Sequence, residues 1–138
     1  MGYSPELWGK EAWHFIHFVA LTYPNNPTEE DRNNYMAFVK SLQFVLPCPS
    51  CSENYKVKFQ DYPPRMDSKR DFFEWTVDIH NMVNKQNGKR ELSYQEAINE
   101  LHQNGMINEL MVIKKTISFT LSAAATILMF SYVLSRKV

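Results

Sequence analysis

Prolines and helix-capping residues punctuate about the first hundred residues of the chain, and the apolar side chains between them recur every three or four positions. The first segment opens at Ser4-Pro5, a capping residue followed by a first-turn proline, and closes at Tyr23-Pro24. The second opens at Thr28, whose three acidic followers suit the positive end of a helix dipole, and closes at Pro47. Because no stretch alternates convincingly with the two-residue period of a strand, the sequence predicts an all-α fold.

Three further helices follow from the same signals. They are expected at about residues 48–59, 68–87 and 93–105. Ser68 caps the second of these three, which ends at Asn87-Gly88, and Ser93 and Glu96 have the spacing of a capping box for the last. We therefore expect a four-helix bundle with a short fifth helix, filling one domain over residues 1–105.

Residues 116–134 form the longest uncharged stretch and contain neither proline nor glycine. At about 1.5 Å per residue, a helix of this length reaches roughly 28 Å, close to the ~30 Å hydrocarbon core of a bilayer. The basic pairs Lys114-Lys115 and Arg136-Lys137 bound the stretch. We therefore predict a C-terminal transmembrane helix at 116–134, after a juxtamembrane linker at 106–115 and before a short tail at 135–138. A buried or amphipathic helix is the alternative, although the stretch lacks a polar stripe at helical spacing.

The chain has no net formal charge, but its charges are unevenly distributed. The part up to Glu109 holds 15 acidic and 11 basic residues, a formal charge of −4, and the remainder carries +4. The predicted domain therefore lacks a basic patch, which argues against nucleic-acid binding. The N-terminal residues also lack the apolar run of a signal peptide. We therefore expect a single-pass, C-terminally anchored membrane protein whose domain lies in the cytosol.

The two cysteines, Cys48 and Cys51, lie three residues apart at the start of a predicted helix. Two cysteines are too few for a disulfide-stapled secreted scaffold. Helix-start amides stabilise a thiolate, which favours redox chemistry at such a pair. A thioredoxin-like site would need a βαβ surround, and a structural zinc site would need two more ligands. The spacing alone therefore leaves open a redox pair beside a cofactor, a zinc site and two unconnected thiols.

Two residue pairs have the i, i+4 spacing that stacks side chains on one helix face. One pair is Trp13 and His17, and the other is His80 and Asn84, with Asn81 beside it. Each pair alone is more often part of a core than of a site. Together with the cysteine pair they supply an aromatic wall, neutral hydrogen-bonding groups and a disulfide. Such a set suits a heteroaromatic cofactor with an adenine and a ribose.

The order of these residues along the chain resembles that of the Erv/ALR family of FAD-dependent sulfhydryl oxidases. The resemblance covers about residues 8–89, and its most distinctive element lies at residues 80–89. The matching elements are Trp8-Gly9-Lys10-x-x-Trp13-x-x-x-His17-x-x-Ala20-x-x-Tyr23-Pro24, Pro47-Cys48-x-x-Cys51, Trp75 and His80-Asn81-x-Val83-Asn84-x-x-x-Gly88-Lys89. The family fold is a four-helix bundle with a short fifth helix, in agreement with the helix prediction.

The resemblance implies FAD as the cofactor. The residues that it assigns to FAD are Gly9, Lys10, Trp13, His17, Tyr23, His80, Asn81, Asn84 and Lys89. Trp13 and His17 would contact the nucleotide from the first helix, with Tyr23 closing the same side. Lys89 would approach the ribose or the phosphates. Lys10 stands where the family usually has arginine, and it lacks the planar fork of a guanidinium.

The resemblance also implies the catalytic roles of the cysteines. Cys51 would lie against the isoalloxazine ring, and Cys48 would be the more exposed partner that exchanges with substrate. The enzyme would form disulfides in protein thiols and pass the electrons through FAD to O2, giving H2O2. The family commonly has a shuttle cysteine pair that this chain lacks. Substrate thiols, or a thioredoxin-like or glutaredoxin-like partner, would therefore reach Cys48 directly.

In its small size and few cysteines the chain resembles the sulfhydryl oxidases of large cytoplasmic DNA viruses. This resemblance implies that the protein is located at a virion or viral-factory membrane. Family members are often homodimers through their first two helices, so a homodimer is also expected. The alternative function is a non-enzymatic, membrane-anchored helical adaptor. Its zinc site would combine Cys48 and Cys51 with His17 or His80. That adaptor would be colourless and would contain stoichiometric metal.

Overall fold

The computed structural model describes residues 2–103. They form four long helices: α1 (Pro5–Leu21), α2 (Glu29–Val45), α3 (Pro49–Asp61) and α4 (Lys69–Gln86). Residues 94–103 are also helical, which agrees with the predicted short fifth helix. The all-α prediction is therefore confirmed. The four long helices belong to one compact unit, Met1–Ile98, and the chain after it forms a second unit.

The helix starts follow the caps seen in the sequence. At the start of α2, Thr28 Oγ1 accepts a hydrogen bond from the Asp31 amide at 3.1 Å, and Asp31 accepts one from the Thr28 amide at 2.9 Å. At the start of α4, Ser68 Oγ accepts from the Asp71 amide at 3.2 Å. These side chains satisfy backbone amides that have no partner inside the helix, which is why each helix begins where it does.

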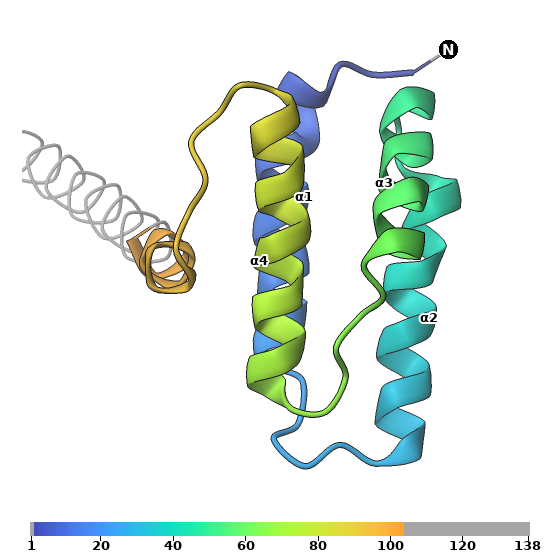
Figure 1. Ribbon diagram of the computed structural model, residues 1–138, viewed down its shortest axis with the longest axis vertical. Helices are drawn as coiled ribbons and strands as arrows, with labels where there is room; N and C mark the ends of the chain where they lie inside the picture. The colour runs from blue at the N-terminus through green and yellow to red at the C-terminus, as the bar shows by residue number, and fades with distance from the viewer. Residues whose placement is uncertain (1, 104–138) are drawn as a thin grey trace, which may run out of the picture. The chain divides into compact units, whose positions relative to one another are not determined.

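Within the first unit, α1 packs along α4, α2 packs along α3, and α3 also contacts α4 (Figure 1). Large apolar side chains fill the space between the helices. Among those fully or almost fully buried are Tyr23, Val39, Phe72, Val77 and Ile79. The α4 helix supplies more of this core than any other helix, because its apolar side chains follow the helical period.

The carbonyl oxygen of Met66 ties three parts of the bundle together. It accepts a hydrogen bond from the Tyr23 hydroxyl at 2.9 Å and another from Arg32 Nη1 at 2.5 Å. Tyr23 follows α1, Arg32 lies in the first turn of α2, and Met66 lies in the loop before α4. This end of the bundle is therefore closed by polar contacts as well as by the aromatic core.

No helix within residues 2–103 is both long and apolar enough to cross a membrane. The transmembrane helix predicted at 116–134, the linker at 106–115 and the tail at 135–138 all lie outside the described residues.

Candidate functional site

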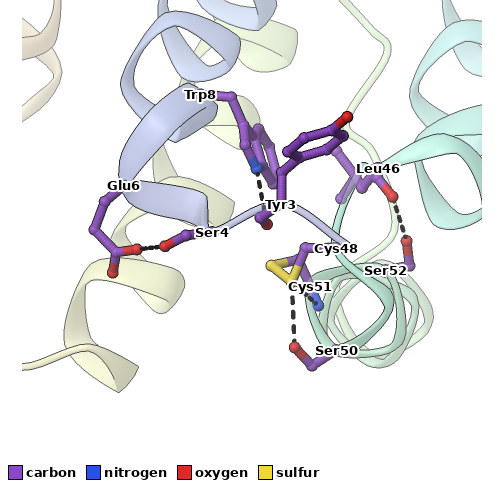
Figure 2. The surroundings of a disulfide bond; sticks show 9 residues. All are labelled: Tyr3, Ser4, Glu6, Trp8, Leu46, Cys48, Ser50, Cys51 and Ser52. Atoms are coloured by element: carbon purple, nitrogen blue, oxygen red, sulfur yellow. Dashed lines mark hydrogen bonds between the residues drawn. A yellow bond between two sulfur atoms is a disulfide. The ribbon is translucent and has the colours of Figure 1, made fainter. Parts of the chain in front are cut away.

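Cys48 and Cys51 form a disulfide at the start of α3 (Figure 2). Cys48 is the N-cap residue, and its Sγ accepts a hydrogen bond from the backbone amide of Cys51 at 3.2 Å. The Ser50 hydroxyl lies 3.2 Å from the same sulfur. The first turn of α3 thus places two donors on Cys48. Because hydrogen bonds to a charged acceptor are stronger than neutral ones, both donors stabilise a Cys48 thiolate once the disulfide opens.

A pocket of about 200 Å³ lies between the four helices and borders this disulfide. Cys51 is part of its wall, whereas Cys48 is not. The α1 helix supplies the largest share of the wall, including Trp8, Gly9 and Trp13. The remaining lining residues are Pro5, Ala12, Ile16, Leu42, Leu46, Ser50, Asn54, Tyr55, Val83, Gln86 and Asn87. A pocket with apolar and aromatic walls and one redox-active sulfur fits a flat ring that exchanges electrons with Cys51.

The two cysteines differ in exposure in the opposite sense to the prediction. Cys48 is only 8% exposed, and Cys51 is partly exposed. The expectation that Cys48 is the more exposed partner is therefore wrong for this structure. The physical reason is that Gly2 lies against Cys48 and Tyr3 is bonded to the neighbouring Pro47, while Cys51 lines the pocket.

Three aromatic rings from α1 and α4 stack beside the pocket. The rings of Trp13 and His80 lie nearly parallel, with centroids 4.4 Å apart and an angle of 9° between their planes. His17 lies behind them, 3% exposed, and its Nε2 is 3.1 Å from Nδ1 of His80. The structure therefore brings together three of the four aromatic residues that the resemblance assigned to the cofactor. Trp13 lines the pocket, and His17 supports His80 from inside the bundle.

Hydrogen bonds determine which ring nitrogens of the two histidines carry protons. The Thr76 hydroxyl donates to the Phe73 carbonyl at 2.7 Å, so its oxygen is left to accept from Nδ1 of His17 at 3.0 Å. His17 Nε2 must then accept from Nδ1 of His80. A neutral imidazole has one donor and one acceptor nitrogen, so Nε2 of His80 presents a lone pair.

Both histidines are held in the neutral form. Burial lowers the pKa of His17 to about 3, and the neighbouring His80 and His14 add to the effect. Burial likewise lowers the pKa of His80 to about 4, with further contributions from His14 and Lys89. Both ring nitrogens of His17 are already engaged, by Thr76 and by His80, which argues against His17 as a zinc ligand. Within residues 2–103, no group of three or more histidine, cysteine or acidic residues is arranged to hold a metal ion.

Gly9 forms part of the pocket wall within α1. A Cβ built there would meet only the Pro5 side chain, at 3.9 Å, so packing against other helices does not require a glycine. Glycine costs roughly 0.5–1 kcal/mol relative to alanine inside a helix. The absence of a side chain leaves the helix backbone open to the pocket at this position. Lys10 is exposed and does not line the pocket.

Tyr23 is not brought to the pocket. It is fully buried, its ring packs against Tyr35 and Phe72, and its hydroxyl is bonded to Met66. The structure thus gives Tyr23 a place in the core, where it offers no surface to a ligand.

Asn81, Asn84 and Lys89 shape the chain after α4. The Asn81 side chain exchanges two hydrogen bonds of 2.8 Å with the backbone of Leu92. The carbonyl oxygen of Asn84 accepts from the Lys89 amide at 2.8 Å, across a turn in which Gly88 has a φ of 65°. Only glycine adopts that conformation without strain. The turn leaves the Lys89 side chain exposed, next to the end of α4 that lines the pocket.

Comparison with known proteins identifies the family. A family model described as the Erv1/Alr family matches residues 10–103. The chain belongs to the Erv1/Alr family. It is 46% identical over 103 residues to a protein of Acanthamoeba polyphaga mimivirus named "probable FAD-linked sulfhydryl oxidase", and the match covers 72% of each chain.

Cellular relatives of the Erv1/Alr family are longer. The chain is 35% identical over 83 residues to the mitochondrial FAD-linked sulfhydryl oxidase erv1 of Schizosaccharomyces pombe, a match that covers 59% of this chain and 46% of that protein. The crystal structure of the FAD binding domain of Erv1 from Saccharomyces cerevisiae superposes with a TM-score of 0.68 at 23% identity. The superposition covers 72% of this chain and 94% of the Erv1 domain. This likeness shows that the two share a fold.

The sequence interpretation of this Erv1/Alr chain left several lining residues out of the site. Trp8 and Val83 lie in the matching motifs but are not among the residues that the resemblance assigns to the cofactor. Leu42 and Leu46 lie outside those motifs. The part of the pocket wall that α1 supplies could have been found from the sequence. Pro5, Gly9, Ala12 and Ile16 follow helical spacing and share the face that lines the pocket.

Proposed function

We infer that this chain is an FAD-dependent sulfhydryl oxidase that forms disulfides in protein thiols through Cys48 and Cys51. The observation that carries this conclusion is the disulfide with one sulfur in the wall of an aromatic pocket, in a chain of the Erv1/Alr family. The similar viral and yeast proteins are named FAD-linked sulfhydryl oxidases. Bound FAD supplies the two-electron step from dithiol to O2, with H2O2 as product.

The pocket residues suit the parts of FAD to different degrees. Trp8, Gly9, Trp13 and Cys51 would hold the flat ring system, since they form the apolar wall beside the disulfide. His80 would add a hydrogen-bond acceptor at Nε2. The exposed Lys10 and Lys89 would place positive charge near the phosphates.

The pocket wall and the cap of α3 support the following thiol chemistry. A substrate thiolate forms a bond to Cys48 Sγ, the Cys48–Cys51 bond breaks, and Cys51 leaves as a thiolate in the pocket wall. A second substrate thiolate attacks the substrate sulfur of this mixed disulfide and releases Cys48 as a thiolate. The Cys51 amide and the Ser50 hydroxyl are placed to stabilise that leaving group. Loss of two electrons to the cofactor then restores the disulfide.

A visible spectrum together with a thiol oxidation assay tests this function. Purified protein is expected to be yellow, to consume O2 in the presence of dithiothreitol and to lose that activity in Cys51→Ser. A colourless protein with one zinc ion per chain would support the adaptor instead. A yellow protein that does not oxidise thiols would also contradict the proposed function.

We also propose membrane attachment through residues 116–134, with the oxidase domain in the cytosol at a virion or viral-factory membrane. The uncharged sequence of this stretch and the similarity to a mimivirus protein support the proposal. Protein thiols or a thioredoxin-like partner at that membrane would be the electron donors. Carbonate extraction of membranes from cells expressing the full chain tests the attachment.

A homodimer through α1 and α2 is a further part of the proposal. Large apolar side chains that these helices expose support it: Leu7, Phe15, Phe18, Phe44 and Val45. Apolar side chains gathered on neighbouring helices favour association because a partner removes them from water. Analytical ultracentrifugation of the full-length protein and of Phe15→Glu would test it, with a dimer expected only for the former.

A further inference from the structure

The N-terminal residues before α1 lie across the start of α3, next to the disulfide (Figure 2). The backbone amide of Tyr3 donates a hydrogen bond of 2.7 Å to the carbonyl of Pro47, the residue before Cys48. Trp8 Nε1 donates to the Tyr3 carbonyl at 3.3 Å, which holds the segment from its other side. Residues 2–4 thus form an extended segment that is bonded through its backbone to the edge at Pro47.

Gly2 lies close to the redox site. A Cβ at this position would lie 2.7 Å from Cδ of Pro49, 3.1 Å from the carbonyl oxygen of Pro47 and 3.4 Å from Cα of Cys48. Real side chains do not come that close to a rigid proline ring, so any larger residue would push the segment outward. Glycine therefore allows backbone to lie directly against the cysteine pair.

This contact explains why Cys48 is buried although it must meet substrate. Only 8% of Cys48 is exposed, and Cys51 lines the pocket assigned to the cofactor. A protein thiol cannot reach Cys48 while backbone atoms lie against it. The Pro47 carbonyl is an acceptor that any extended peptide with a free amide can use, as in strand addition to an exposed edge.

We propose that the edge formed by Pro47 and Cys48 docks an extended segment of the protein thiol substrate, and that Gly2 and Tyr3 occupy this edge until the substrate displaces them. The inference rests on the proposed oxidase function. In the docked complex a substrate amide replaces that of Tyr3 on the Pro47 carbonyl. The adjacent substrate thiolate then bonds to Cys48 Sγ, and the electron pair of the broken disulfide bond stays on Cys51 as a thiolate.

The rate at which a cysteine-containing peptide reduces the disulfide tests the displacement step. The full-length protein with bound FAD is mixed with the peptide under anaerobic conditions. Loss of flavin absorbance and alkylation of the freed cysteines are followed together. Tyr3→Pro removes the amide donor, Gly2→Val adds the side chain that does not fit, and a deletion removes both residues.

All three variants are expected to be reduced about 2- to 10-fold faster than the parent, the factor that corresponds to one net backbone hydrogen bond. The matched control is Tyr3→Ala, because the Tyr3 side chain is 71% exposed and its amide is kept. Its rate is expected to equal that of the parent. If the three variants react no faster than this control, the segment does not compete with substrate and the inference is overturned.

Methylation of the peptide backbone tests the docking itself. A series of peptides carries one N-methyl group at each position next to the cysteine, and one member is expected to react several-fold more slowly. Equal rates throughout the series would refute docking on Pro47. Failure of the oxidase function is distinguishable, because the parent would then hold no flavin or would leave dithiothreitol unoxidised.

Discussion

Acidification from pH 7 to pH 5 is expected to destabilise the domain through His17 and His80. Burial holds the pKa of His17 at about 3 and that of His80 at about 4 in the folded protein, whereas both titrate near 6.5 in the unfolded chain. Between these limits the unfolded chain binds two protons that the folded chain does not. The stabilising contribution is therefore fully present above pH 6.5 and is lost as the pH falls.

The size of the effect at pH 5 depends on the unfolded state alone, because both histidines are still neutral in the folded protein. Each pH unit below 6.5 costs about 1.4 kcal/mol per histidine, which gives about 2 kcal/mol for each and about 4 kcal/mol for the pair. Small domains have total stabilities of about 5–15 kcal/mol. Acidification to pH 5 therefore removes a large share of the free energy that stabilises the folded domain.

Urea unfolding of the full-length protein at pH 7, 6 and 5, at one fixed excess of FAD, measures this loss. His17→Gln and His80→Gln are each expected to remove about half of the difference in unfolding free energy between pH 7 and pH 5. His102→Gln changes an exposed histidine and serves as the matched control. If either buried substitution leaves the difference between pH 7 and pH 5 as large as in the parent, the argument from burial is refuted.

Four other outcomes test the site. Thr76→Val is expected to destabilise the domain by about 1–3 kcal/mol and to change the ¹⁵N shifts of the two buried histidines, because His17 loses its acceptor, whereas Thr76→Ser preserves the shifts. Trp13→Ala is expected to lower flavin occupancy at least several-fold in a protein with unchanged helical content, and full yellow colour would contradict its place in the pocket. Cys48→Ser is expected to show a long-wavelength charge-transfer band from the Cys51 thiolate beside the flavin, and Cys51→Ser to show none; the opposite pattern would reverse their roles. Removal of residues 112–138 is expected to leave dithiothreitol oxidation close to the full-length rate, and loss of flavin on truncation would contradict the membrane assignment.

The helices were predictable because their ends depend on neighbours in sequence. The side-chain caps at Thr28 and Ser68 each act within one turn, and α1 starts at a first-turn proline, so the start of each helix can be located from a few residues. The third helix begins one residue later than predicted, since Cys48 caps it from outside. The face of α1 that carries Trp13 and His17 was predictable for the same reason, because these residues are one helical turn apart.

The contacts that decide the chemistry join residues far apart in the chain. Thr76 fixes the proton positions of His17 from 59 residues away, and nothing near either residue signals the pair. Gly2 likewise lies against Cys48 although the two residues are far apart in the sequence. Cys48 is buried there, so the prediction that it is more exposed than Cys51 is wrong. Tyr23 had the right motif spacing but finds its hydroxyl partner 43 residues later, in the core. Local periodicity carries no information on such pairings.

The position of Cys48 at the start of α3 has a consequence for the redox equilibrium of the enzyme. In the oxidised state this sulfur is a neutral cap, whereas in the reduced state a thiolate there receives the same amide hydrogen bond at the positive end of the helix. A charge in that position is worth about 0.5–1 kcal/mol, and it stabilises only the dithiol form. For a two-electron couple this corresponds to a reduction potential higher by about 10–20 mV. Each turn of the catalytic cycle thus strengthens and weakens the cap of α3, and the helix itself biases the disulfide toward transfer to substrate.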